Sequence, residues 1–575
     1  MKKIIVSLAM LSLLLTGCSK KNSNITTSNK TNSTTTIKTT TSSQTISNDD
    51  VSGNTSSIEI DEDTIDGEFK LTDDNKNAIV GVNGIYTISE AGSYKAVGKL
   101  TNGQIYVDVS DGEVEISLEG VSISNNSVSP IFVNDCSDVT LKIKKDTLNY
   151  VYDNRTTDYS ESDDDTIGKS AIYVSNGDLK INGKGTISIT STSNSGIHGK
   201  DNVTIKNCTM LVKAMNNGIK GNDKVTIEEN PTIGIVCGNN GIRTSNSDLS
   251  SKGKQHGYIY INGGTITINS YGDAIDAEYA VEIGSSTDSD GVTYTPTIDI
   301  YTNIYSSYTL TTTTTSKSIS YIGPSRPGGG FDGGGFNSGK SAEKSDSSAK
   351  GIKANEYIKV TDGMIFAYTY DDCLHTNNDT LETNVKANAT INIEGGTLNL
   401  KASDDAIHAD GTLNITDGNI YIAKSHEGIE ANIINVTGGK TVIYADDDGV
   451  NASKQINVSG GLLDVTVSPN GDTDGIDSNG TISITGGIVI TRGPNNQNMC
   501  PLDADSSISI TGGTVVIVGY YTTKISTNLT KTQSSSGMSS GSHTVTIGSE
   551  TIDYTNTYNY SGSVYVLSSA KATIS

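Results

Sequence analysis

The chain has 575 residues, and its 65 aspartates and glutamates outnumber its 41 lysines and arginines, so its formal net charge is −24. This charge disfavours nucleic acids and anionic membrane surfaces as direct partners, and it favours bound cations. Hydrophobic residues make up 34% of the chain, which contains 61 glycines and no tryptophan, a composition typical of strands and turns with almost no helical signal.

The N-terminal end of the chain has the features of an export signal. Two lysines precede an apolar run over residues 4–15, which is too short to cross a bilayer. The run ends on Leu-Thr-Gly-Cys, which resembles a bacterial lipobox, so residues 1–18 are interpreted as a lipoprotein signal peptide with Cys18 as the lipidated residue. An ordinary signal peptide with an incidental cysteine is the alternative. Residues 19–57 are rich in Ser, Thr and Asn and predict a disordered tether, so we expect a cell-surface protein, lipid-anchored to the outer face of the bacterial membrane.

Residues 58–575 contain a repeat of about 22 residues, which predicts one stacked domain rather than several separate ones. Each unit carries an aliphatic residue inside an acidic phrase, as in "DDAIHADG" (404–411) and "DDDGVNAS" (446–453). We call these aliphatic residues the markers. In chain order they are Ile172, Ile197, Ile219, Ile242, Ile275, Ile352, Leu374, Ile407, Ile429, Val450, Ile476 and Leu502, with Ile131 as an earlier, degenerate copy.

The runs around each marker predict strands that stack into coils. Polar and apolar residues alternate within each run, so one face of each strand is buried, and Gly-Gly pairs supply the positive φ that a turn needs. Stacking at the strand spacing of roughly 4.8 Å puts equivalent residues of successive units in columns. The predicted fold class is therefore all-β, a parallel β-helix built as a solenoid of about 22-residue coils. A leucine-rich repeat, the main competitor, needs a Leu-x-x-Leu-x-Leu frame that these units lack.

Two regions depart from the repeat. Residues 323–350 are rich in Gly, Pro and Ser and predict a loop inserted between coils. From about residue 520 to 575 the phrase is lost and irregular strands follow, which predicts a C-terminal β cap, because a solenoid needs its open end covered. The segment from Ile58 to about Leu100 is expected to cover the other end.

The position two residues before the marker collects carboxylates in the second half of the repeat. Neighbouring carboxylates would repel each other by roughly 3 kcal/mol at a spacing of about 5 Å and an effective dielectric constant of about 20. Cations that bridge the column would remove this repulsion, and Ca²⁺ suits it because calcium accepts many oxygens in irregular geometry. The predicted calcium ligands are Asp372, Asp404, Asp405, Glu427, Glu430, Asp447, Asp448, Asp474 and Asp477. The alternative for each single aspartate is turn chemistry, since Asp side chains cap their own backbone.

The position one residue after the marker holds cations in the first half of the repeat. Lys220, Arg243 and Lys353 project from one face of nearly successive coils, and with His375 and His408 they are the predicted ligand-binding residues. A row of cations beside bound calcium would receive a regularly spaced polyanion, whereas the alternative is a solvated charged face. Acids and strong bases are expected to occupy different stretches of the solenoid. The cysteines after the lipobox are scattered without a C-x-x-C pair, which predicts buried thiols rather than a zinc site.

Several phrases resemble the signature coils of the carbohydrate-binding β-helix lipoproteins of cellulolytic clostridia. They include "NNGIKGND" (216–223), "KGIKANEYIKVTDG" (350–363) and "DDAIHADGTLNITDGNIYIAKSHEGIEA" (404–431), and the resemblance runs from about Ile58 to the C-terminus. It implies a right-handed β-helix similar to that of pectate lyases. It also implies calcium bound by coil aspartates and adhesion to cellulose and to acidic plant polysaccharides such as polygalacturonate.

The chain departs from the pattern of that family at a few coils. Asn217, Asn240 and Cys500 stand where an acid is usual, so the metal sites are expected between Asp372 and Asp477.

We predict a surface-anchored, calcium-binding carbohydrate-binding protein, a monomer that touches the membrane only through its lipid and binds no nucleic acid. One alternative is a calcium-dependent pectate lyase, in which Lys220, Arg243 or Lys353 would remove the C5 proton of a metal-bound uronate. Another is a non-catalytic structural adhesin, whose metals only hold the coils together. Fold alone does not choose among these functions.

Overall fold

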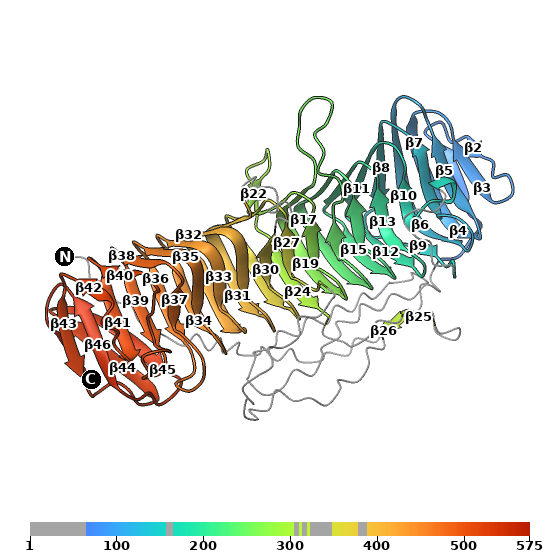
Figure 1. Ribbon diagram of the computed structural model, residues 1–575. Helices are drawn as coiled ribbons and strands as arrows, with labels where there is room; N and C mark the ends of the chain where they lie inside the picture. Colours follow the sequence, from blue (N-terminus) through green and yellow to red (C-terminus); the bar gives the residue numbers. More distant parts are fainter. Residues whose placement is uncertain (1–64, 157–164, 304–309, 313–318, 322–347, 378–387) are drawn as a thin grey trace, which may run out of the picture.

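The computed structural model describes residues 65–156, 165–303, 310–312, 319–321, 348–377 and 388–575. The predicted signal peptide, the predicted tether and most of the predicted inserted loop lie outside these residues. Within them the fold is all-β and contains no α-helix, and a single 3₁₀ turn spans Asp165–Ile167. The strands form one elongated stack, from β1 (Lys70–Asp73) near one end to β47 (Ala572–Ile574) at the other (Figure 1).

Most strands pair in parallel with strands one repeat earlier and one repeat later, and these pairings form three ladders. The marker ladder contains β3 (Ile85–Ile88), β5 (Gln104–Asp108), β7 (Ile131–Asp135), β10 (Ser170–Val174), β13 (Ser195–Gly199), β16 (Ile219–Gly221), β18 (Ile242–Arg243), β20 (Ile275–Ala277), β27 (Ile352–Ala354), β30 (Leu374–Thr376), β32 (Ile407–Lys424), β33 (Ile429–Val436), β35 (Val450–Val458) and β37 (Ile476–Ser478). Because β32, β33 and β35 are long, they continue into the next ladder.

The second ladder contains β4 (Gly92–Thr101), β6 (Glu113–Asn125), β8 (Asp138–Ile143), β11 (Asp178–Gly183), β14 (Asn202–Lys206), β17 (Lys224–Cys237), β19 (Tyr258–Ser270), β21 (Ala280–Ile283), β28 (Tyr357–Val360), β31 (Thr390–Lys401), β38 (Thr481–Ile484), β40 (Ser507–Ile510) and β42 (Ile525–Thr527). The third ladder contains β9 (Leu148–Asp153), β12 (Thr186–Ser191), β15 (Thr209–Ala214), β24 (Thr297–Thr302), β29 (Met364–Tyr368), β34 (Lys440–Tyr444), β36 (Leu462–Thr466), β39 (Ile488–Arg492) and β41 (Thr514–Gly519), together with the C-terminal parts of β6, β17, β19, β31 and β32.

The register of the marker ladder confirms the predicted alignment of the repeat. Ile131 pairs with Ile172, and the pairing continues from marker to marker as far as a bridge from Ile476 to Leu502. It holds even from Ile275 to Ile352, across the longest insertion. Every marker side chain is at most 1% exposed, because stacked units bury an apolar row that one unit alone leaves open to water.

Glycine is required where the chain turns from the second ladder to the third. Gly461, in the turn before β36, has a φ of 73°, and a Cβ there would lie 2.5 Å from the carbonyl oxygen of Gly438 in the preceding coil. An L side chain would therefore be strained twice, by its backbone conformation and by the coil against which it stacks.

An asparagine ladder runs along the outer face of the second ladder. The amide of Asn414 donates to the side-chain oxygen of Asn392 at 2.9 Å, Asn435 donates to Asn414 at 2.9 Å, and Asn457 donates to Asn435 at 2.8 Å. Each side chain sits one coil above the last, so these hydrogen bonds tie four coils together outside the core.

Antiparallel strands lie at both ends of the stack. At the N-terminal end, β1 pairs antiparallel with β2 (Ala78–Ile79) and with β4. At the C-terminal end, β46 (Ser563–Ser568) pairs antiparallel with β41 and with β43 (Thr530–Ser534), and β44 (Gly541–Ile547), β45 (Glu550–Asn556) and β47 form a small sheet. Two short hairpins, β22 (Ser286–Thr287) with β23 (Thr293–Tyr294) and β25 (Leu310–Thr312) with β26 (Ile319–Tyr321), leave the stack.

The C-terminal strands build a second apolar cluster on the outer face of the third ladder. Ile490 and Val516 of the last coils pack there against side chains such as Tyr554 and Val564. Arg492 is buried beside them, where it pairs with Asp464, donates from Nε to Asn556 at 2.9 Å and lies over the ring of Tyr554. Arg492 is thus held by an ion pair within the last coils and reaches the strands that follow them through Asn556 and Tyr554 of β45.

Candidate functional site

The outer face of the marker ladder carries the predicted charged column in the predicted order. Register pairs run from His198 through Lys220, Arg243 and Asp276 to Lys353. They continue through the residues His375, His408, Glu430, Asn451 and Asp477. The side chains therefore stand one coil apart, at the strand spacing of roughly 4.8 Å.

The carboxylates two residues before the markers hold neighbouring coils together. The amide N–H of Asp405 donates to Oδ1 of Asp372 at 3.0 Å, and that of Asp474 donates to Oδ1 of Asp448 at 2.7 Å. Lys350 donates its amide N–H to Asp273 in the same way, at 2.7 Å. One oxygen of Asp372, Asp448 and Asp273 thus accepts from the backbone of the next coil, rather than from its own turn as the turn alternative predicted, and the second oxygen remains for other chemistry.

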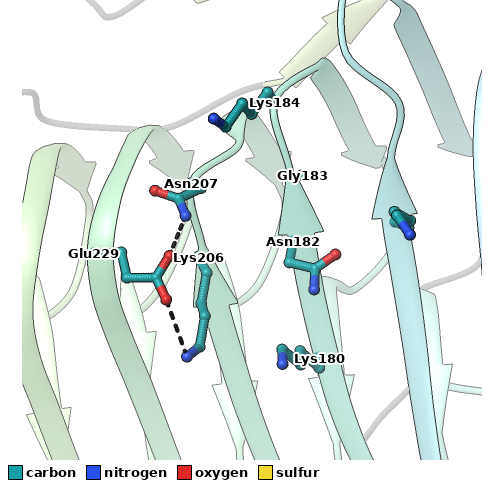
Figure 2. Close-up of a pocket in the computed structure, with 8 residues that line it drawn as sticks. Lys180, Asn182, Gly183, Lys184, Lys206, Asn207 and Glu229 are labelled. Atoms are coloured by element: carbon teal, nitrogen blue, oxygen red, sulfur yellow. Dashed lines mark hydrogen bonds and ion pairs between the residues drawn. The ribbon is translucent and has the colours of Figure 1, made fainter. Parts of the chain in front are cut away.

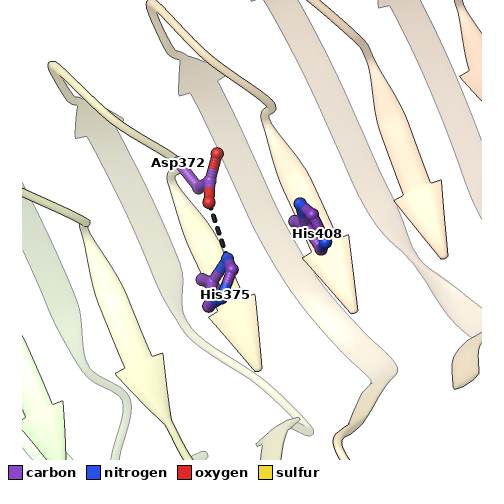
Figure 3. Close-up of side chains that lie close together, drawn as sticks. All are labelled: Asp372, His375 and His408. Carbon is purple, nitrogen blue, oxygen red and sulfur yellow. Dashed lines mark hydrogen bonds and ion pairs between the residues drawn. The ribbon is translucent and has the colours of Figure 1, made fainter. Parts of the chain in front are cut away.

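In two successive coils the second oxygen contacts a histidine three residues later. Oδ2 of Asp372 lies 2.6 Å from Nδ1 of His375 (Figure 3). Oδ2 of Asp405 lies 3.0 Å from Nδ1 of His408. Burial lowers the pKa of His375, against the effect of Asp372. Its Nε2 is buried and has no hydrogen-bond partner in the described part of the chain, so His375 presents a neutral ring with an unused nitrogen.

His408 has the opposite charge state because carboxylates surround it. Its Nδ1 also lies 3.2 Å from Glu430, and its Nε2 lies 3.4 Å from Asp410. Burial opposes the charged form, but the hydrogen bonds to Asp405 and Asp410 and the charge of Glu430 raise the pKa of His408 to about 11. At neutral pH this imidazolium is an internal cation in the acidic column.

Lys350 is a second internal cation, and sequence reasoning did not select it as a site residue. Its Nζ lies 2.5 Å from Asp371 and 3.5 Å from Asp372. Although burial of Asp372 opposes ionisation, the hydrogen bond from His375 and the charge of Lys350 lower its pKa. The sequence did contain a signal for this role. Lys350 stands two residues before its marker, where neighbouring coils have acids, and stacking places it beside those acids.

Four other carboxyl groups of the column form no ion pair with any residue that the structure describes: Glu427, Asp448, Asp474 and Asp477. Burial and the charges of Asp405, Glu430 and Asp448 raise the pKa of Glu427 to about 9. Burial and neighbouring aspartates raise the pKa of Asp448 and of Asp474 to about 7, and that of Asp477 to about 6. Without an added cation, this half of the column cannot carry its full negative charge at neutral pH.

Several of the predicted metal ligands come close enough to share an ion. Ligand atoms within 4.8 Å of one another occur in five groups among the described residues, and each group contains residues from adjacent coils. These groups are Asp371 with Asp372 and Asp404, Asp372 with His375 and His408, Asp404 with Asp405 and His426, Asp405 with His408 and Glu430, and His426 with Glu427 and Asp447. Carboxylate oxygens from adjacent coils suit calcium, which accepts irregular geometry. Asp448, Asp474 and Asp477 belong to no such group, so an ion there would need backbone oxygens or water as further ligands.

The predicted cationic row is partly neutralised by the protein itself. Nε of Arg243 lies 3.4 Å from Asp276, and Nζ of Lys353 lies 4.0 Å from Asp273. Lys220 is buried. The expectation that acids and bases occupy different stretches is therefore wrong at β18, β20 and β27, where the two kinds of charge meet.

A separate, lysine-lined cavity of about 310 Å³ lies on the outer face of the second ladder (Figure 2). Its lining residues are Lys142, Lys180, Asn182, Gly183, Lys184, Lys206, Asn207 and Glu229. Lys206 pairs with Glu228 at 2.6 Å and with Glu229 at 3.3 Å, and Lys142 pairs with Glu115 at 3.1 Å. Because these glutamates balance the lysines, the cavity is a weaker anion receptor than its lining suggests.

A known protein family matches the chain over most of its length. A family model described as "Carbohydrate-binding domain-containing protein" matches residues 82–384, 380–428 and 425–566. The chain belongs to this family. A relative described in the same words, from Acetivibrio thermocellus, is 30% identical over 200 residues, which cover 35% of this chain and 68% of the relative.

One solved structure resembles part of this carbohydrate-binding chain. It is that of the polysaccharide lyase-like protein from C. thermocellum, as a gadolinium derivative, with 28% identity and a TM-score of 0.35, covering 41% of this chain and 92% of that one. The column from β7 to β37 lies inside the ranges that the family model matches. Family membership makes a polysaccharide the partner. In the described residues, no helix has the length and apolar character needed to cross a membrane.

Proposed function

We propose that the protein is a calcium-dependent carbohydrate-binding protein of the cell surface, which recognises acidic plant cell-wall polysaccharides such as polygalacturonate. The observation that carries this proposal is Glu427, a largely buried carboxyl group with neighbouring carboxylates and no cationic partner in the described chain. A bound divalent cation would let Glu427 and its neighbours ionise together. The same cation would offer an open coordination position to the carboxylate of a uronate.

Calcium would be held where the column lacks internal cations. We assign it to Glu427 and Asp447, with Asp448, Asp474 and Asp477 extending the site along the coils. Asp372, Asp405 and Glu430 already face Lys350 or His408, so an ion there must compete with protein cations. Asp404 stands between the two regions, since it groups both with Asp372 and with His426.

The finer description of the fold is part of the same proposal. Three parallel ladders in strict rotation, with one strand of each per repeat, support a right-handed parallel β-helix with antiparallel caps. In that arrangement the marker ladder presents one continuous outer face, and a long polysaccharide could follow the column over many coils.

Binding without turnover fits the charged column better than a lyase does. A proton-abstracting base must be uncharged and within hydrogen-bond reach of the metal-held uronate. Burial opposes the charge on Lys350, but Asp372 and Asp371 raise its pKa, so this lysine is protonated at neutral pH. Arg243 lies beside Asp276, and Lys353 lies beside Asp273. These acids favour the charged forms of both side chains, which can bind a sugar carboxylate but cannot remove a proton.

The test combines binding and turnover in one experiment. The mature protein is incubated with polygalacturonate, with calcium or with a chelator, and both sedimentation and the ultraviolet absorbance of unsaturated ends are followed. We expect binding to weaken about tenfold or more on chelation, because a charge-assisted contact contributes roughly 1.5–3 kcal/mol. Glu427→Gln should reproduce this loss, whereas Asp111→Asn, an exposed change outside the column, should not. A steady rise in absorbance that Lys353→Ala abolishes would make the protein a lyase, and binding unaffected by chelation would refute the calcium site.

A further inference from the structure

The outer face of the third ladder carries a row of aromatic rings that the charged column does not use. Tyr301 of β24, Phe366 and Tyr368 of β29, Tyr421 of β32 and Tyr444 of β34 all occupy outward positions, since the residues that alternate with them are buried core. We call these five residues the aromatic strip. Tyr301 and Phe366 lie 5.9 Å apart between ring centroids, and so do Tyr421 and Tyr444.

The strip is open to solvent at its centre. Tyr421 is 42% exposed, and Met364, on the same face of β29, is 52% exposed. The tyrosines of the second ladder differ, because Tyr258 stacks on Tyr260 at 5.2 Å and Tyr357 donates a hydrogen bond to Glu282. Those rings are held by one another and by Glu282, whereas Tyr421 and Met364 leave adjoining apolar surface in water, and exposed apolar surface of this kind is a candidate for contact with a partner.

The spacing of the strip suits a chain of sugars. Register pairs place Phe366, Asn399 and Tyr421 in one column on successive strands. Phe366 and Tyr421 are therefore two strand spacings apart, roughly 9.6 Å, a length close to that of an extended disaccharide unit. In a polysaccharide whose alternate residues are turned over, the same ring face recurs at this interval, and Asn399 lies where the intervening residue presents its hydroxyl groups.

The charges of this face favour an uncharged ligand. In the third-ladder parts of β24, β29, β31, β32 and β34, Asp299 is the one acid at an outward position, and burial raises its pKa. Nζ of Lys401 lies 4.8 Å from the ring centroid of Tyr368, so this ammonium already has a partner. An aromatic face is the negative part of the ring quadrupole, and it attracts the weakly positive C–H groups on the flat side of a pyranose.

We propose that the aromatic strip binds an extended, uncharged polysaccharide chain that lies along the third ladder. This inference rests on the carbohydrate-binding function but does not depend on calcium. Sugar rings stack on Phe366 and Tyr421, and their hydroxyl edges face Asn399. The protein thus has two faces for cell-wall glycans, an acidic one that needs a metal and an aromatic one that does not.

The test uses the mature protein with microcrystalline cellulose as the uncharged probe and polygalacturonate as the acidic one. We expect Tyr421→Ala and Phe366→Ala each to weaken binding to cellulose about tenfold, which corresponds to a loss of about 1.4 kcal/mol. Polygalacturonate binding should be unchanged, and a chelator should not affect cellulose binding. Tyr260→Ala, which removes an outward ring from the second ladder, is the matched control and should bind cellulose like the parent protein.

Each result bears on the strip separately from the calcium column. Tyr421→Phe keeps the ring, so it should retain cellulose binding and shows that a loss in Tyr421→Ala does not come from misfolding. Cellulose binding that survives the Phe366→Ala, Tyr421→Ala double change would overturn the proposal, as would a parent protein that binds polygalacturonate but not cellulose. Loss of polygalacturonate binding on chelation with cellulose binding intact would support both faces.

Discussion

At the scale of single residues, carboxyl groups at the same position of the repeat have pKa values shifted in opposite directions. Asp372 and Glu427 occupy equivalent positions in the repeat, and both are largely buried. Asp372 faces His375 and Lys350, which lower its pKa, whereas the neighbours of Glu427 are carboxylates, and its pKa rises to about 9. Burial alone does not decide the charge, because the residues one coil away supply or withhold the countercharge.

Glu427→Gln should therefore act in opposite directions with and without calcium. In metal-free protein at neutral pH, the amide resembles the protonated acid that the folded state prefers, so we expect a stability gain of roughly 1–3 kcal/mol. With calcium, the variant loses a ligand, and the rise in Tm that calcium gives the parent protein should shrink. Thermal unfolding of both proteins with and without chelator measures the two effects, and an equal calcium response would contradict the assignment of Glu427.

The pH dependence of metal-free stability follows from the raised pKa values. Asp448 and Asp474, at about 7, and Glu427, at about 9, bind protons in the folded state that the unfolded chain releases near pH 4. The contribution of these three groups to stability is therefore full at low pH and is lost as pH rises through their folded-state pKa values. In the presence of a chelator, Tm should decrease between about pH 5 and pH 9, and saturating calcium should remove most of this decrease. A flat profile without metal would contradict the shared burial of these carboxylates.

At the scale of elements, a buried arginine contacts both the last coils and the C-terminal strands. Arg492 of β39 pairs with Asp464 of β36 and donates from Nη1 to the carbonyl of Val465 at 3.0 Å. Its contacts with Asn556 and Tyr554 reach β45. The apolar cluster around it covers the outward face of the final third-ladder strands, where other coils are open to water.

Arg492→Met should be among the most destabilising single changes in this region. It leaves Asp464 buried without a countercharge, which costs about 3–5 kcal/mol. The paired change Arg492→Met with Asp464→Leu removes both charges and should recover most of the loss, because an apolar pair of similar volume is often neutral. Urea unfolding of the single and double variants checks this. A double variant as unstable as the single one would show that Arg492 acts through Asn556 and Tyr554 instead.

The marker ladder was predictable because a fixed register converts a sequence period into spatial neighbours, and Ile275 finds Ile352 whatever lies between them. The neutralisation of the column was only partly predictable. Lys350 was not among the predicted site residues, although its long side chain reaches Asp371. Phe366 and Tyr421 occupy ordinary alternating positions, so nothing local distinguished the aromatic strip until the strands were stacked.

At the scale of the whole molecule, the proposed anchor should be separable from the fold. Cys18 and the tether lie outside the described residues, and the stacked domain begins beyond them. Cys18→Ser should release the protein from the membrane fraction to the medium, with Tm and polysaccharide binding unchanged. Cell fractionation followed by thermal unfolding checks both parts. A variant that stays with the membrane would show that the lipobox interpretation is wrong.

Ile275 pairs directly with Ile352, so the stacking of these two coils is kept although a long segment is inserted between them. Duplication or deletion of one whole unit by unequal recombination would likewise leave both termini intact, because each coil contacts only its neighbours. Copy number in the gene then sets the reach of the molecule. Every added unit lengthens the outer faces of the molecule by about 4.8 Å. Gain or loss of single repeats would therefore change the length of the glycan-binding faces in steps of one strand spacing.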